Sequence, residues 1–129
     1  MTRFGRRAPQ ILAAAAASVL ALSAAGAVLA EAKSRLVDCR IESERKVQIN
    51  GKCRFTPDEG GSFTLEHADP KRTVFFGEIM SVTVSVVSAG VAEVRGLTRQ
   101  GINSRWGEAR RMANDRACWQ GSDFKICAR

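Results

Sequence analysis

The chain has 129 residues, of which 20 are basic and 13 acidic, so its formal net charge is +7 at pH 7. This length leaves room for one small domain and excludes a large multidomain enzyme. A single histidine and the absence of any Cys-x-x-Cys pair argue against a zinc site and against most enzyme classes.

The first thirty residues have the pattern of a secretory signal peptide. Three arginines precede an apolar run over residues 11–29, and small residues follow at the cleavage positions. The run is long enough for a retained membrane anchor, but its many alanines insert weakly, which favours cleavage. We therefore predict a signal peptide at 1–30 and one mature domain at 31–129. The predicted location is periplasmic or secreted, with no stable membrane span after cleavage.

All four cysteines, Cys39, Cys53, Cys118 and Cys127, lie in the predicted mature domain. An even count in an exported chain indicates two disulfides rather than a metal site or a reactive thiol. Pairing of near neighbours, Cys39 with Cys53 and Cys118 with Cys127, suits β-hairpins. In the chain-entropy description these bonds contribute about 3 and about 2.7 kcal/mol. A nested pairing closes longer loops, and the sequence leaves it open.

Alternating apolar residues predict a succession of short antiparallel strands. Asn50-Gly51 stands within the alternating segment 47–55, which predicts a hairpin with a type I′ turn at that dipeptide. Pro and Gly predict a turn or loop over residues 56–61. The next two strands are predicted over residues 62–67 and 73–76.

The clearest strand covers residues 79–87, with apolar side chains on one face and Ser or Thr on the other. A turn at 88–90 leads into a strand over 91–95. An apolar stripe predicts one short helix over 104–113, which Gly107 weakens by about 1 kcal/mol. The mature domain is therefore predicted to be mostly β: a small antiparallel β-barrel or sandwich of six to eight short strands, with one short helix and two disulfides.

The last segment of the chain predicts a hairpin that carries the second disulfide. A turn near residues 122–123 places Cys118 opposite Cys127, within disulfide reach. The same register places Trp119 opposite Ile126 on the other face of the hairpin. The segment is therefore predicted to belong to the sheet, with Trp119 packed in the core.

Three short motifs resemble small exported bacterial proteins of unassigned function. They are Cys-Arg-Phe at 53–55, Gly-Ser-Phe at 61–63, and the Cys-Trp…Ile-Cys hairpin at 117–127. The resemblance covers most of the mature domain. It implies export and a disulfide-bonded β fold, and it implies no activity and no site residues.

Positive charge is concentrated in the last third of the chain. From Arg95 onward there are eight basic and three acidic residues, a net charge of +5, whereas the rest of the mature domain is near −1. This asymmetry favours an anionic partner, although an ordinary arginine-rich surface also explains it. The expected partner is an anionic envelope component or an acidic protein, and an exported location argues against nucleic acid.

Arginine and tryptophan side chains supply the candidate binding site, because aromatic faces stack on rings and guanidinium groups hold carboxylate or phosphate. The candidate binding residues are Arg105, Trp106, Arg110, Arg111 and Arg116. We expect a non-enzymatic binding or structural domain of the cell envelope that engages its partner through this surface. No cofactor, no metal and no catalytic residue is predicted.

A small secreted hydrolase, or an inhibitor of a secreted hydrolase, is the alternative. A hydrolase requires His67, or two carboxylates, to face a substrate in a cleft. His67 continues the alternation of Phe63 and Leu65, which favours an ordinary strand residue, and no Gly-x-Ser-x-Gly surrounds any serine. The candidate carboxylates are Asp58, Glu59, Glu66, Glu78 and Glu93, and no sequence rule selects a pair among them.

Overall fold

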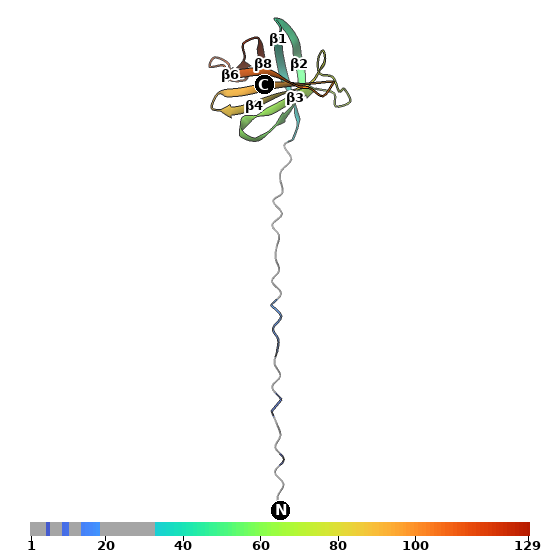
Figure 1. The fold of residues 1–129 in the computed structure, drawn as a ribbon, viewed down its shortest axis with the longest axis vertical. Coiled ribbons are helices and arrows are strands. Elements are labelled where there is room, and N and C mark those ends of the chain that lie inside the picture. The colour runs from blue at the N-terminus through green and yellow to red at the C-terminus, as the bar shows by residue number, and fades with distance from the viewer. Residues whose placement is uncertain (1–4, 6–8, 11–13, 19–32) are drawn as a thin grey trace, which may run out of the picture.

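The computed structural model describes residues 5, 9–10, 14–18 and 33–129, so the predicted signal peptide lies mostly outside the described residues. Residues from 33 onward form a closed antiparallel barrel of eight strands (Figure 1). The strands are β1 (Arg35–Ser43), β2 (Lys46–Pro57), β3 (Phe63–His67), β4 (Ile79–Ser88), β5 (Val91–Thr98), β6 (Asn103–Arg111), β7 (Cys118–Gln120) and β8 (Phe124–Ala128). The described part of the chain contains no helix that could span a lipid bilayer.

Each strand pairs with the next along the chain, and β8 returns to pair with β1. At this seam Ile41 lies opposite Ile126, and Asp38 and Arg129 exchange backbone hydrogen bonds of 3.1 and 2.9 Å. Closure removes the exposed edges that an open sheet would present. The prediction of a small antiparallel barrel or sandwich of six to eight strands with two disulfides is therefore confirmed, and of its two architectures the structure has the barrel.

The core fills the inside of the barrel with the inward face of each strand. On β1 the buried residues alternate as Val37, Cys39 and Ile41. On β4 Val82 and Val84 are fully buried, as their alternation with Ser and Thr predicted. An eight-stranded barrel is just wide enough for such side chains to fill it, or for one small ligand to occupy part of it.

Both disulfides join near neighbours, as the hairpin argument favoured. Cys39 and Cys53 belong to the core cluster inside the barrel. In the C-terminal hairpin Cys118 lies opposite Cys127 and Trp119 lies opposite Ile126, so the predicted register is confirmed. Trp119 is only 2% exposed, which confirms that it packs in the core.

The first hairpin turns at Glu44 and Arg45, so the turn predicted at Asn50-Gly51 is wrong. Asn50 lies inside β2, opposite Arg40 of β1. Glu44 and Arg45 have φ values of 52° and 63°, the left-handed conformation that a type I′ turn requires. The longer hairpin pairs the whole of β1 and brings the first two cysteines together, and these gains outweigh the local preference of Asn-Gly for a turn.

The helix predicted over residues 104–113 is also wrong, because most of this segment forms strand β6. A register shift between Val94 and Arg95 leaves Trp106 without a partner on β5. This β-bulge is accompanied by a φ of 116° at Gly107, which a residue with a side chain rarely adopts. The one helical element among the described residues is a 3-10 turn at Glu59–Gly61.

The strand predicted over 73–76 does not form. Instead Phe76 makes a single bridge to Ile79, and both amides of Phe75 and Phe76 donate to the carbonyl of Ile79, at 2.8 and 3.2 Å. Phe75 is buried against the core. The segment therefore forms a tight turn that precedes β4.

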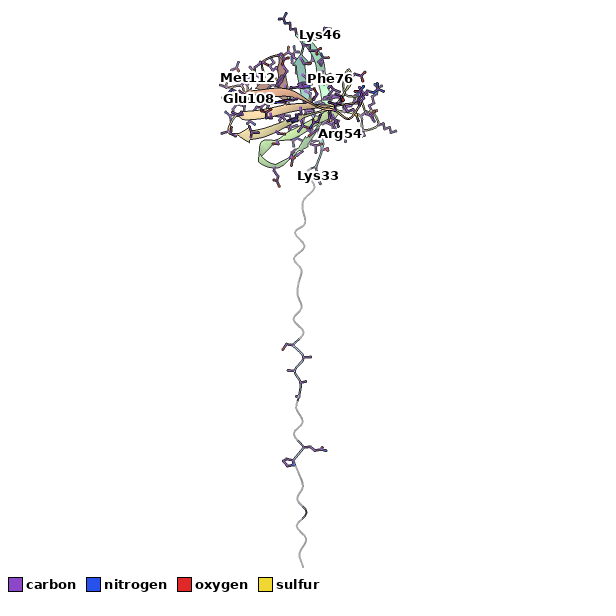
Figure 2. All side chains as sticks on the ribbon, in the orientation of Figure 1. Lys33, Lys46, Arg54, Phe76, Glu108 and Met112 are labelled. Carbon is purple, nitrogen blue, oxygen red and sulfur yellow. A yellow bond between two sulfur atoms is a disulfide. The ribbon has the colours of Figure 1, made fainter. Side chains whose placement is uncertain are left out.

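The connections between strands divide between two ends of the barrel. We call the end formed by residues 44–45, 68–78, 99–102 and 121–123 the open end. Lys46 beside the first turn and Lys33 before β1 lie at opposite ends of the barrel (Figure 2).

At the end opposite the open end, two arginines stack on core aromatic rings. The guanidinium carbon of Arg35 lies 4.5 Å from the ring centroid of Phe55, and that of Arg111 lies 4.6 Å from the ring of Trp119. Such cation–π contacts stabilise by about 0.5–1 kcal/mol at exposed positions. Two basic side chains therefore cover aromatic rings at this end.

Candidate functional site

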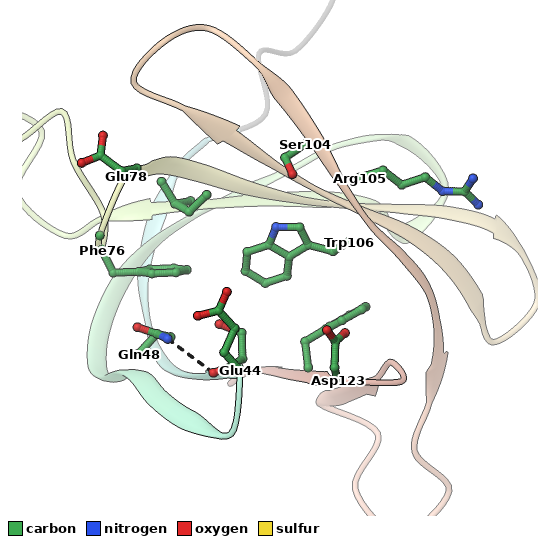
Figure 3. A pocket seen from close by; sticks show the side chains of 12 residues that line it. Glu44, Gln48, Phe76, Glu78, Ser104, Arg105, Trp106 and Asp123 are labelled. Atoms are coloured by element: carbon green, nitrogen blue, oxygen red, sulfur yellow. Dashed lines mark hydrogen bonds between the residues drawn. The ribbon is translucent and has the colours of Figure 1, made fainter.

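A cavity of about 530 Å³ opens at the open end of the barrel (Figure 3). Three connections contribute to it, β1–β2, β3–β4 and β7–β8, together with the first half of strand β6. Its lining residues are Ser43, Glu44, Gln48, Phe76, Gly77, Glu78, Ile79, Ser104, Arg105, Trp106, Asp123 and Phe124. We call this space the mouth cavity.

Three aromatic rings form the apolar wall of the mouth cavity. The ring centroids of Phe76 and Trp106 are 6.2 Å apart at an interplanar angle of 61°, and those of Trp106 and Phe124 are 5.6 Å apart at 63°. These edge-to-face contacts are a favoured geometry for aromatic pairs. Trp106 stands between the other two rings and is only partly buried, so it remains accessible from the cavity.

Two glycines leave room for the rings of Trp106 and Phe124, because a side chain at either glycine would collide with one of them. A methyl group at Gly96 of β5 would lie 2.8 Å from the indole Nε1 of Trp106, and one at Gly121 would overlap the ring of Phe124. Glycine inside or beside a strand often marks such a close approach. The β-bulge at Trp106 completes the arrangement by turning the indole toward the mouth cavity.

Backbone hydrogen bonds hold the rim of the mouth cavity. The Phe76–Ile79 turn is closed by the amide of Ile79, which donates to the carbonyl of Phe76 at 2.8 Å. The amide of Arg99 donates to the carbonyl of Glu78 at 2.9 Å, and this bond joins two rim loops. The amide of Gly121 closes the β7–β8 turn. The cavity is therefore largely formed before any ligand enters.

The charged groups of the mouth cavity are mainly carboxylates. Figure 3 shows the carboxylate of Glu44 pointing into the cavity, with Asp123 on the rim. Glu78 accepts a hydrogen bond from Gln100 at 3.3 Å. The single basic residue of the lining, Arg105, points away from the cavity in the same view. The polar side of the cavity is therefore acidic.

Arg105 and Arg110, two of the five predicted binding residues, are held by neighbouring carboxylates. Arg105 donates from Nε and Nη2 to Glu93, at 3.2 and 3.0 Å. Arg110 donates to Glu108 at 3.1 Å. Both arginines are on the outer surface of β6, and each pair is exposed to solvent. The carboxylates of Glu93 and Glu108 therefore partly neutralise the positive charge of these two arginines.

The other predicted residues are at different ends of the barrel. Trp106 faces the mouth cavity, whereas Arg111 covers Trp119 at the opposite end, with its Nε buried and without an acceptor among the described residues. Arg116 is exposed in the β6–β7 connection and forms no ion pair with any residue from 33 onward. The structure therefore does not bring the five residues together on one surface.

His67 lines a second hollow, of about 340 Å³, together with Arg54 and Glu66. Its Nδ1 accepts a hydrogen bond of 2.9 Å from the amide of Asp69, which fixes the ring in the β3–β4 connection. Within the described residues no serine or cysteine hydrogen-bonds to His67. The same part of the chain holds no group of three His, Cys, Asp or Glu side chains placed to bind a metal ion.

Three ion-paired groups on the outer surface have shifted pKa values. Hydrogen bonds from Arg129 hold the pKa of Asp115 below its ordinary value, and the same pair raises the pKa of Arg129. Hydrogen bonds from Lys125, at 3.3 Å, and Arg40, at 3.1 Å, lower the pKa of Glu42. The Glu42–Lys125 pair crosses the β1–β8 seam and so supports barrel closure.

Sequence inspection found Trp106 but missed most of the mouth cavity. Phe76 was assigned to a strand, and Glu44 and Asp123 were not singled out. The available signal was Gly96, an isolated glycine in the interior of a strand pattern, which marks a bulge or a close approach.

Comparison of the chain with models of protein families, with curated proteins and with solved structures gave no match. Function is therefore inferred from the site itself.

Proposed function

We propose that the chain is an exported, non-enzymatic binding domain of the cell envelope, and that its ligand occupies the mouth cavity. The observation that carries the proposal is a cavity of about 530 Å³ with aromatic walls. This volume is within the range of small-molecule sites, which recur at barrel mouths and combine apolar walls with a few polar groups. Export is supported by the N-terminal sequence pattern and by the disulfides, which persist in oxidising compartments.

The test uses the indole N–H signals of the two tryptophans in a ¹⁵N-labelled sample of the protein. A filtered extract of small envelope molecules is added, and Trp106→Phe assigns the two signals. We expect the Trp106 signal to shift while that of buried Trp119 stays in place. Shifts that occur elsewhere in the protein and leave Trp106 unmoved would contradict the mouth cavity as the site.

An anionic envelope component or an acidic protein is a separate, second proposal. It is favoured by Arg116, which is exposed and forms no ion pair among residues 33–129. Its test is recovery of envelope partners by the wild type and by Arg116→Glu, with Arg110→Glu as a comparison at an already paired position. Loss of a partner only in Arg116→Glu supports the proposal, and equal recovery by all three proteins contradicts it.

A further inference from the structure

We infer that the ligand of the mouth cavity carries an organic ammonium group, an inference that rests on the proposed function. The first observation is the sign of the charge in the cavity. Glu44 and Asp123 line it without an ion-pair partner among the described residues. The nearby cation, Arg105, is engaged by Glu93 through two hydrogen bonds. A bound cation would therefore meet uncompensated negative charge.

The second observation is the wall of aromatic rings. Trp and Phe rings attract a cation placed over their faces, and a partly enclosed group of rings is the usual recognition site for alkylated ammonium ions. Phe76 and Trp106 are partly buried and line the cavity at an angle of 61° to each other, so they present π surface in two orientations. Phe124, which is 3% exposed, packs edge-to-face against Trp106 and supports it. The alkyl groups of such a ligand would contact the same rings.

The third observation is the backbone conformation of Glu44. A type I′ turn favours Asn or Gly, and a residue with a longer side chain pays a conformational cost there. Glu44 has a φ of 52°, yet it carries its carboxylate into the mouth cavity (Figure 3). The turn requires this conformation of any residue at the position, and strained residues also cluster at functional sites. Its neighbour Arg45 shares the strain and does not line the cavity, so it serves as a matched control.

Two other ligand classes fit less well. Divalent metal ions such as Mg²⁺ and Ca²⁺ take oxygen ligands, and the three aromatic rings of the wall offer none. A neutral sugar would stack on Trp106 but would leave the charges of Glu44 and Asp123 unmatched. An ammonium group on an alkyl chain uses both the rings and the carboxylates.

The experiment titrates the purified protein with choline and with 3,3-dimethyl-1-butanol, its neutral isostere, and follows the Trp106 indole signal. We expect choline to bind about tenfold more tightly than the isostere, because only choline carries charge. Glu44→Gln should weaken choline binding by about fivefold to tenfold, whereas Arg45→Gln should change it by less than about twofold. Unfolding curves of both variants confirm that they fold.

The outcomes separate this inference from the proposed function. Equal binding of choline and its isostere overturns the ammonium inference and leaves the mouth cavity as a binding site. A shift of the Trp106 signal with MgCl₂ or glucose but not with choline also overturns the ammonium inference and leaves the mouth cavity as a binding site. If neither these probes nor the envelope extract shifts the Trp106 signal, the proposed function falls as well. Tighter choline binding that depends on Glu44 supports both.

Discussion

The indole of Trp106 occupies the space that a side chain at Gly96 would fill. A methyl group there would lie 2.8 Å from the indole Nε1 and 3.1 Å from Cδ1 of Ile79. A Cβ atom is almost never found within 3.0 Å of a side-chain atom of another residue, so the indole must shift if the methyl group is added. The aromatic wall of the mouth cavity therefore depends on a residue of β5 that has no side chain.

Gly96→Ala is expected to destabilise the protein by about 1–3 kcal/mol, the usual cost of overpacking a core, and to displace Trp106. Urea unfolding and the Trp106 indole signal measure the two effects. Gly51→Ala is the matched control in β2, where an added methyl group meets nothing within 4 Å. We expect that control to be neutral or stabilising by about 0.4–1 kcal/mol. An unchanged Trp106 signal in Gly96→Ala would contradict the proposed contact.

The two disulfides should differ in their contribution to stability. The cysteines of the outer bond, Cys118 and Cys127, are buried but lie outside the core cluster. Removing this bond by Cys118→Ala with Cys127→Ala is expected to cost about 2.7 kcal/mol from chain entropy. Removing the inner bond by Cys39→Ala with Cys53→Ala should cost about 3 kcal/mol from chain entropy, with a further penalty for the void in the core. Urea unfolding of the two double variants measures the difference, and a larger loss for the outer pair would argue against this account.

In the β1–β2 turn, a substitution that stabilises the fold is expected to weaken ligand binding at one of the two turn positions. Glu44→Asn and Arg45→Asn should each raise the free energy of unfolding by about 0.5–1 kcal/mol, because Asn tolerates the left-handed conformation better. Only Glu44→Asn should also weaken choline binding, because only Glu44 lines the mouth cavity. Unfolding curves and choline titrations of both variants provide the test. Equal loss of binding in the two variants would assign the effect to the turn and not to the carboxylate.

Acid should weaken the protein partly through Asp115 and Glu42, whose pKa values are lowered by their basic partners. A carboxyl group with a lowered pKa in the folded state stabilises above its ordinary value, and this contribution is lost as the pH falls through the folded-state pKa. Asp115→Asn should therefore be less stable than the wild type at pH 7. The gap should close as the pH falls below 3.8 for Asp115, and below 4.5 for Glu42→Gln.

Thermal unfolding from pH 7 down to about pH 2 follows this gap. Glu59→Gln is the control, because Glu59 is exposed and forms no ion pair among the described residues. A constant difference between Asp115→Asn and the wild type over the whole range would show that the ion pair with Arg129 does not stabilise the fold. The same comparison applies to Glu42→Gln.

Strands with regular alternation could be predicted from the sequence, and the bulged strand could not. The pattern around Val82 and Val84 predicted β4, and cysteine spacing predicted the register of the last hairpin. In β6 the bulge lets two inward residues, Trp106 and Ala109, stand three positions apart instead of the two or four of a regular strand. A spacing of three positions is also that of residues on one face of a helix. Local periodicity therefore indicated a helix where the sheet has an irregular strand.

The candidate site was harder to predict because it is assembled from three connections and strand β6. Trp106 could be named from its residue type, but its neighbours Phe76 and Phe124 come from other hairpins, and only the tertiary fold brings them together. Glu44 was missed because Asn50-Gly51 has the stronger local preference for a turn. Pairing along the full length of β1, a tertiary effect, decided the turn instead.

Under the proposed export, the pairing of β1 with β8 has a consequence for the order of folding. A chain that crosses a membrane amino end first delivers β1 before all other strands and β8 after them. The β1–β2 hairpin can fold early, and its disulfide can form as soon as Cys53 emerges. One edge of β1 nevertheless stays open to other chains until Phe124–Ala128 arrives. If the proposed export holds, barrel closure is the last step of folding, and a stall in translocation would leave an edge on which the protein can aggregate.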